Sequence, residues 1–300
     1  MEEMKLQTPV QVGRSAVRLS VNDRIITLGS CFADNIGRKM EDLGFNSLSN
    51  PFGTLYNPVS VCNSIARLAS GVPFSSKDCV MMGAGAGLVC SFSHHTTFAR
   101  QTEEEFLEAA NSSLEKASAF WKSAGKVIIT LGTAWCYEHI ASGEIVSNCL
   151  KRDAKEFSRR RLSVSEVSLL LRNTIRRFPD KEFILTVSPI RHLKDGAHGN
   201  QLSKSTLLLA IDEVIREFPE RADYFPAYEI FMDELRDYRF YAPDMTHPTD
   251  QAVSYIWSRF VDWAFPESDI PELEKRRKEF AAARHRPINF SYSRDLNQNN

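Results

Sequence analysis

Three short apolar runs along the chain predict the buried strands of a β-sheet. They cover residues 24–28, 126–131 and 183–188, and each is rich in Ile, Leu, Val and Thr. The first run is followed by Gly29-Ser30 and the second by Gly132-Thr133. Two runs that stop in the same way predict parallel strands whose carboxyl ends meet at one edge of the sheet.

Between these runs, apolar residues recur at helical spacing. In residues 32–43, Phe32, Ile36 and Met40 fall on one face, and Gly44 follows as a stop signal. Further helices are predicted over residues 58–70, 102–123, 163–178, 204–217 and 249–264. This repeated alternation predicts a three-layer α/β fold, with a mainly parallel sheet flanked by helices.

The weakest periodicity lies in residues 71–100, which contain a Gly-Ala run and two neighbouring histidines. We predict a β-rich insertion there. Residues 8–265 are predicted to form one α/β domain that carries this insertion. Residues 266–300 are predicted to form a C-terminal extension with a charged helix over 272–286 and a polar tail.

Composition narrows the function classes. The chain has 300 residues and a formal net charge of −1, so no charge excess points to nucleic acid or to a charged membrane surface. The N-terminus lacks the basic-then-apolar pattern of a secretory signal, and no apolar run could span a bilayer. We therefore predict a cytoplasmic protein with no integral membrane segment and no nucleic-acid partner.

The six cysteines are scattered singly, with no C-x-x-C pair and no histidine at zinc-finger spacing. In a reducing compartment they are most simply separate thiols, several of them small core residues. No metal and no cofactor are predicted.

The turn Gly29-Ser30-Cys31 is the first candidate for chemistry, because a buried strand that ends there places a hydroxyl or a thiol at the ligand-binding edge of an α/β sheet. The alternative is purely structural. In that interpretation the glycine makes a turn, Ser30 caps the next helix, and Cys31 is a small buried residue.

A base for such a nucleophile is predicted at His247, because Asp244 stands three residues earlier in a turn bounded by prolines. A histidine that takes a proton from a nucleophile needs an acceptor on its second ring nitrogen, and Asp244 could supply one. The alternative is an ordinary surface turn, in which such a pair is common.

These residues resemble a known family. The hexapeptide from Leu28 to Ala33 resembles the motif that names the GSCFA domain family. Similar to that family's other landmarks are Asn50-Pro51-Phe52-Gly53, Asn148-Cys149, Ser188-Pro189 and the Asp244 to Pro248 turn. The resemblance covers about residues 8–265. The family's sequences resemble the SGNH/GDSL hydrolase superfamily, which implies a flavodoxin-like sheet and ester hydrolysis or acyl transfer.

Carried onto this chain, the superfamily's nucleophile position falls on Cys31, with Ser30 as the alternative after a one-residue shift of the turn. We prefer Cys31, because a helix N-terminus would lower its pKa and His247 could complete its activation. The resemblance assigns His247 and Asp244 to the superfamily's Asp-x-x-His block.

The resemblance also implies an oxyanion hole. Gly53 fits the superfamily's second block, whose glycine N–H helps to hold the oxyanion. The third block is Gly-x-Asn, whereas this chain has Gly132-Thr133-Ala134 and no asparagine there. Thr133 or Asn57 could substitute, although Thr133 could equally be a strand-end cap.

Three further residues are candidates for substrate binding. His94 and His95 are predicted to line a substrate entrance from the insertion, or else to form a surface pair. Trp135 could wall an apolar acyl pocket or belong to the core. The arginine run at residues 159–161 could bind an anionic headgroup, or be a solvated face.

The sequence therefore predicts an SGNH-like esterase or acyltransferase that forms a covalent acyl-enzyme on an acylated small molecule, glycan or lipid. One alternative is a catalytically inactive module of the same fold that binds a glycan or a lipid headgroup, motivated by the missing asparagine. A second is a thiol-dependent redox or transfer enzyme centred on Cys31. The acyl group, the acceptor and the oligomeric state stay open.

Overall fold

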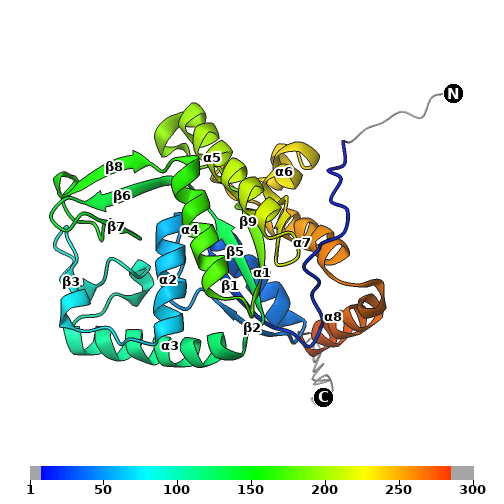
Figure 1. The fold of residues 1–300 in the computed structure, drawn as a ribbon, viewed down its shortest axis with the longest axis horizontal. Helices are drawn as coiled ribbons and strands as arrows, with labels where there is room; N and C mark the ends of the chain where they lie inside the picture. The colour runs from blue at the N-terminus through cyan, green and yellow to red at the C-terminus, as the bar shows by residue number, and fades with distance from the viewer. Residues whose placement is uncertain (1–7, 285–300) are drawn as a thin grey trace, which may run out of the picture.

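The structure is a computed structural model that describes residues 8–284 (Figure 1). Its centre is a five-stranded sheet of β1 (Arg24–Gly29), β2 (Asn46–Ser49), β5 (Lys126–Leu131), β9 (Glu182–Val187) and β10 (Ala222–Phe225). All four neighbouring pairs are parallel, and the spatial order is β10-β9-β5-β1-β2. Renumbered within the sheet this order is 2-1-3-4-5, the flavodoxin-like arrangement. The predicted α/β fold is confirmed.

Helices cover both faces of the sheet (Figure 1). One layer contains α2 (Pro58–Ser70), α3 (Glu103–Ser123), α4 (Val164–Arg177) and α5 (Gly196–Glu217). The other contains α1 (Cys31–Asp42), α6 (Ala227–Glu229), α7 (Asp250–Ala264) and α8 (Ile270–Arg284). Successive residues of a strand point to opposite faces of the sheet. Ile25 packs against the layer that contains α1 and α7, and Ile26 packs against the layer that contains α2 and α5. Both faces are buried, which explains why the central strands are apolar throughout.

Two excursions lie beyond α2, at the end of the molecule opposite α8 (Figure 1). The predicted insertion contains only one short antiparallel pair, β3 (Val80–Met81) with β4 (Val89–Cys90). The second excursion forms an antiparallel sheet in the order β7-β6-β8, from β6 (Trp135–His139), β7 (Glu144–Val146) and β8 (Phe157–Arg161). Short 3₁₀ or π turns complete the fold at Ser76–Asp78, Thr96–Phe98, Ala154–Glu156, Leu193–Asp195, Ile230–Glu234, Tyr238–Phe240 and Glu267–Asp269.

The segment before β1 is hydrogen-bonded to the last turn of α7, although the two are far apart in the sequence. The Ser15 N–H donates to Trp263 O at 2.9 Å, and the Leu19 N–H donates to Ala264 O at 3.0 Å. Both acceptors belong to the last turn of α7, so the residues before β1 are bound to the end of the C-terminal core helix.

Candidate active site

The Gly29-Ser30-Cys31 turn lies where the strand order of the sheet reverses. Gly29 ends β1 with φ +130°, and a Cβ atom at this position would stand 2.0 Å from Thr130 O on β5. The next N–H, that of Ser30, donates to the same Thr130 oxygen at 3.0 Å. Only glycine allows the two strands to meet this closely. Open α/β sheets place their ligand crevice at such a switch point.

Ser30 and Cys31 have different environments within this turn. Ser30 is fully buried, and its Oγ caps α1 by accepting the Phe32 N–H at 3.3 Å while donating to Ser188 Oγ at 3.0 Å. Cys31 is the first residue of α1 and is only half-buried. The accessible nucleophile of the pair is therefore the thiol.

The thiol is not activated by its position alone. Burial and the Asp34 carboxylate raise the pKa of Cys31 to about 11, although its own backbone N–H, that of Phe32 and the charge of Lys204 act in the opposite direction. The expected lowering by the helix N-terminus is outweighed, because desolvation penalises the thiolate more than the helix end stabilises it. Cys31 is a neutral thiol at pH 7 and needs a base.

Lys204 on α5 is a part of this region that sequence analysis missed. Its side chain is fully buried, and its Nζ donates to Gly132 O at 2.7 Å and to Ser188 O at 2.9 Å, at the carboxyl ends of β5 and β9. Burial lowers the pKa of Lys204 to about 7, partly offset by Cys31. A signal existed, because Lys204 continues the buried face that Leu207 and Ile211 define on the same helix.

The structure brings His247 and Asp244 together. Asp244 Oδ1 accepts the N–H groups of Thr246 and His247, both at 2.9 Å, and Oδ2 lies 2.6 Å from His247 Nδ1. These hydrogen bonds lower the pKa of Asp244, and the bond from the His247 backbone N–H has the largest effect. The carboxylate is therefore ionised, and it can only accept hydrogen bonds. The imidazole proton is thereby held on Nδ1, and Nε2 is left to act as a base.

Cys31 and His247 lie at the same edge of the sheet. Helices α1 and α7 run in parallel, as shown by the bond from Lys39 Nζ to Ser254 Oγ at 3.0 Å and by a small pocket between Asn35 and Asp250. Both helices therefore begin at the carboxyl edge. Within the described chain no hydrogen bond joins Cys31 to His247, whose side chain is 48 % exposed.

His192 is a further histidine in this region, and the charges of both Lys204 and His247 act on it. Burial, then the charges of Lys204 and His247, lower the pKa of His192 to about 4. Its ring packs edge-on against Tyr56, with centroids 5.9 Å apart. Sequence analysis did not assign a function to His192 or to Tyr56, which come from loops far apart in the chain.

The three predicted oxyanion donors are all engaged elsewhere. The Gly53 N–H donates to Asn50 O at 2.7 Å, and the Thr133 N–H donates to Tyr56 O at 3.1 Å. The Thr133 hydroxyl pairs with Ser203 Oγ at 3.0 Å. In this geometry neither Gly53 nor Thr133 offers the expected donor, because the turn and the strand end use their N–H groups.

Asn57 is a structural cap. Its Oδ1 accepts the Ser60 N–H at 2.9 Å at the start of α2, and its Nδ2 donates to Ser60 Oγ and to Val146 O at 2.9 and 3.3 Å. Asn50 joins the candidate turn to the first turn of α1. Its Oδ1 accepts the Gly29 N–H at 2.8 Å, and its Nδ2 donates to Asp34 at 2.6 Å.

The two neighbouring histidines separate. His95 is half-buried, its N–H donates to Phe52 O at 2.9 Å, and its charge acts on Asp34, so it borders the Cys31 region. His94 is fully buried and packs against Phe52 and other phenylalanine rings. The expectation that His94 lines an entrance is therefore corrected, because its ring belongs to an aromatic core.

Trp135 and the arginine run take part in the excursion around β8. Trp135 Nε1 donates to Gly199 O at 3.1 Å, and the Arg159 guanidinium lies 5.4 Å from the Trp135 ring. Arg159 pairs with Asp195, and Arg160 with Glu166. These contacts give the arginines partners within the protein, so no anion is needed to explain them.

The sheet order and the residues at its carboxyl edge define the class of protein. It is a flavodoxin-like α/β protein whose candidate site contains a cysteine at a helix N-terminus and a turn with an Asp–His pair. A family model of the GSCFA family matches residues 24–260, and the chain therefore belongs to that family. A search of curated proteins finds no significant match.

Two further findings concern metal binding and membrane spans. The described residues contain no group of three or more His, Cys, Asp or Glu side chains that could hold a metal ion. None of the helices in residues 8–284 combines the length and the apolar character needed to cross a bilayer.

Proposed function

We propose that the protein is an ester hydrolase or acyltransferase that forms a thioester on Cys31. The observation that carries this proposal is the half-buried thiol at the switch point of the sheet, with the Asp244–His247 pair at the same edge. Its substrate class is an acylated small molecule, glycan or lipid.

In the proposed reaction the Cys31 sulfur attacks the ester carbonyl carbon while its proton passes to His247 Nε2. The C–O bond then breaks, and the leaving oxygen takes that proton back from His247. Water or an acceptor hydroxyl next gives its proton to His247 and attacks the thioester, which frees the thiol. Because the thiol pKa is about 11, proton removal by His247 is essential to the first step.

The exposed turn that carries His247 must approach Cys31 when substrate binds, since apo structures often hold catalytic groups further apart than the reaction requires. The oxyanion would be held by the backbone N–H of Cys31 at the start of α1, which stabilises negative charge.

The test is hydrolysis of a series of short p-nitrophenyl acyl esters by the full chain. Cys31→Ala is expected to abolish turnover, and His247→Ala to lower kcat/KM by about 10²–10⁴. Cys79→Ala, a thiol outside this region, serves as the matched control. Mass spectrometry after a single turnover should find the acyl group on Cys31. Full activity in both variants would contradict the proposal.

The inactive binding module is the second candidate, and the engagement of all three predicted oxyanion donors favours it. It predicts no turnover of any ester and no acylated residue in the wild-type protein. Labelling with iodoacetamide and with a fluorophosphonate separates the cases further. The acyl-enzyme proposal expects iodoacetamide on Cys31 to block turnover and no fluorophosphonate on the buried Ser30.

A further inference from the structure

Arg191 is a partly buried arginine that the protein leaves without a partner. It lies in the loop between β9 and α5, and within residues 8–284 its guanidinium makes no hydrogen bond, no ion pair and no ring contact. The guanidinium is not sealed inside the protein, because none of its nitrogens is among the fully buried atoms that lack a partner. A dissolved ligand can therefore reach it.

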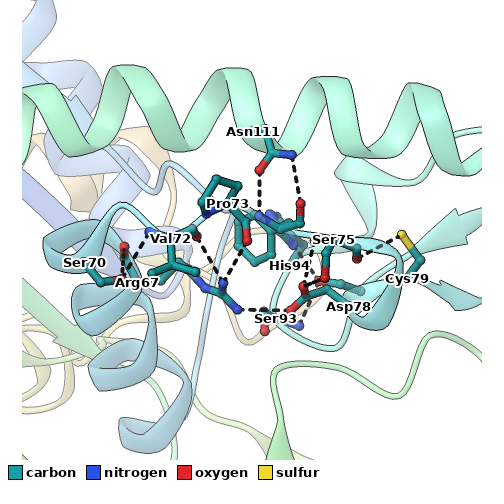
Figure 2. Close-up of polar contacts among 12 residues, drawn as sticks. Arg67, Ser70, Val72, Pro73, Ser75, Asp78, Cys79, Ser93, His94 and Asn111 are labelled. Atoms are coloured by element: carbon teal, nitrogen blue, oxygen red, sulfur yellow. Dashed lines mark hydrogen bonds and ion pairs between the residues drawn. The ribbon is translucent and has the colours of Figure 1, made fainter.

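The other partly buried arginines of the described chain all have partners, and Arg67 is an example (Figure 2). The Arg67 guanidinium pairs with Asp78 at 3.0 Å and donates to two backbone carbonyls at 3.1 and 3.4 Å. Arg259 likewise pairs with Glu234 at 2.6 Å. Removing a charge from water without a compensating contact costs free energy. The exception at Arg191 therefore indicates a partner from outside the protein.

The backbone holds Arg191 at the carboxyl edge of the sheet. On one side of it, the Ile190 N–H donates to Ser188 O at 2.8 Å. On the other side, the His192 N–H donates to Asn200 Oδ1 on α5 at 2.9 Å. Both neighbours are bound to regular structure, so the position of Arg191 is set by the fold.

This loop begins beside the candidate nucleophile. Ser188 Oγ lies 3.0 Å from Ser30 Oγ, in the turn that carries Cys31. Arg191 is three residues further along the chain, so its Cα lies within about 11 Å of the Ser188 Cα even if the segment is fully extended. An ester whose carbonyl lies at Cys31 can thus place a group a few bonds away against the guanidinium.

Arg191 belongs to a cluster of positive charge with Lys204. The charge of Arg191 acts on Lys204 and on Tyr228, and Lys204 Nζ lies 5.2 Å from the Tyr228 ring. The carboxylates of this region are bound by other groups, namely Asp34 by Asn50, Asp195 by Arg159, Glu229 by Tyr224 and Asp244 by His247. Within the described chain no carboxylate therefore neutralises Arg191 by direct contact.

The negative group closest to the thiol lies on the opposite side of Cys31. Asp34 is in the first turn of α1 and is bound by Asn50, which follows β2. In the strand order β10-β9-β5-β1-β2, Cys31 follows β1 and Arg191 follows β9, so Arg191 and Asn50 flank Cys31 from opposite sides. An anionic group is attracted to the β9 side and repelled from the β2 side, which gives the substrate one favoured orientation.

We propose that Arg191 binds an anionic group of the substrate, so that the ester taken by this site carries a carboxylate or a phosphate besides its acyl group. The inference rests on the acyl transfer proposed for Cys31 and narrows its substrate class. Both anions have the planar or tetrahedral oxygens to which a guanidinium donates two parallel hydrogen bonds.

The test uses two matched pairs of esters and the full chain. 4-Acetoxybenzoate and its methyl ester differ by one negative charge on the leaving group. Mono-p-nitrophenyl adipate and p-nitrophenyl hexanoate differ by one negative charge on the acyl group. In at least one pair, kcat/KM should favour the charged ester. Arg191→Gln should reduce this preference roughly tenfold or more, mainly through KM, because a hydrogen-bonded charge pair to bound substrate is lost.

Two variants control for charge and for general effects of substitution. Arg191→Lys keeps the charge but not the two-pronged donor, so it should retain part of the preference. Arg277→Gln removes an exposed arginine on α8, whose neighbour Arg276 donates to Leu43 O at the end of α1 furthest from Cys31. It should behave as wild type. Arg191→Gln should also melt as wild type does, because Arg191 makes no bond within the described protein.

The outcomes separate this inference from the proposed function. Equal turnover of charged and neutral esters, or a preference that Arg191→Gln retains, overturns the inference and leaves the esterase proposal intact. If no ester is turned over, the esterase proposal fails, and calorimetric titration with benzoate and phenyl phosphate decides the role of Arg191. Saturable binding that Arg191→Gln abolishes then supports the anion site. Absence of binding, or equal binding by the variant, overturns it.

Discussion

Two charged side chains act on Cys31 with opposite sign, which makes its reactivity a direct test of the site. Asp34 raises the pKa of the thiol, and Lys204 lowers it. Asp34→Asn should therefore speed alkylation of Cys31 by N-ethylmaleimide at pH 6–9, by roughly threefold to tenfold, and Lys204→Met should slow it by a similar factor at pH 6. The rate is read as mass-labelled Cys31 against time.

The pH dependence of the alkylation rate distinguishes an effect of the Lys204 charge from an effect of its packing. Since the pKa of Lys204 is about 7, its ammonium is present at pH 6 and largely gone at pH 9. Lys204→Met should thus slow alkylation at pH 6 and leave it close to wild type at pH 9. Lys122→Met, at an exposed position, is the control. An equal slowing at both pH values would show that Lys204 acts by packing alone.

The sequence predicts site residues that are close together along the chain, but it does not predict those that only folding brings to the site. Asp244 and His247 share one turn, so their spacing alone indicated the pair that the geometry shows. Lys204 reaches the Cys31 region from a distant helix, through carbonyls at two strand ends. The choice between Ser30 and Cys31 likewise depended on burial, which the sequence does not specify.

At the scale of elements, the contact between β1 and β5 depends on one glycine. Gly29→Ala would place a methyl group 2.0 Å from Thr130 O, at a φ of +130° that other residues avoid. We expect a loss of at least about 2 kcal/mol in the free energy of unfolding, measured by urea denaturation. Gly125→Ala, where a Cβ meets nothing within 4 Å, should change it little. Similar losses in both variants would contradict this account.

The sequence does not predict the bounds of strands and helices correctly where their residues are polar. The edge strand β2 reads Asn-Ser-Leu-Ser, and because it carries no apolar run the sequence does not predict a strand there. Helix α5 begins at Gly196 rather than near residue 204, because its first turns are Gly, His, Asn and Gln and become helical through tertiary contacts. The central strands and α4, with its Ser163 cap, were predicted well because they are apolar or capped locally.

At the scale of the whole molecule, the buried His94 and the half-buried His192 predict acid sensitivity. Burial lowers the pKa of His94 to about 3 and that of His192 to about 4, against about 6.5 in an unfolded chain. The unfolded state therefore binds more protons below pH 6.5. The stability that these groups contribute is complete above pH 6.5 and is lost as the pH falls towards 4.

The measurement is the urea midpoint between pH 7 and pH 4. His94→Leu should lower stability at neutral pH, because Ser91 loses its 2.6 Å partner, yet it should flatten the fall with pH. His198→Leu, at an exposed position, should keep the wild-type slope. An unchanged slope in His94→Leu would mean that His94 does not drive the acid transition.

The pairing of the N-terminal segment with α7 also sets an order of events during synthesis. At about 5–20 residues per second, His247 is made roughly 10–40 s after Cys31, and the Trp263 and Ala264 carbonyls that bind Ser15 and Leu19 come later still. A nascent chain therefore carries the thiol before it carries the base. On the proposed mechanism, acyl transfer begins only after α7 has been made and the segment before β1 has paired with its last turn.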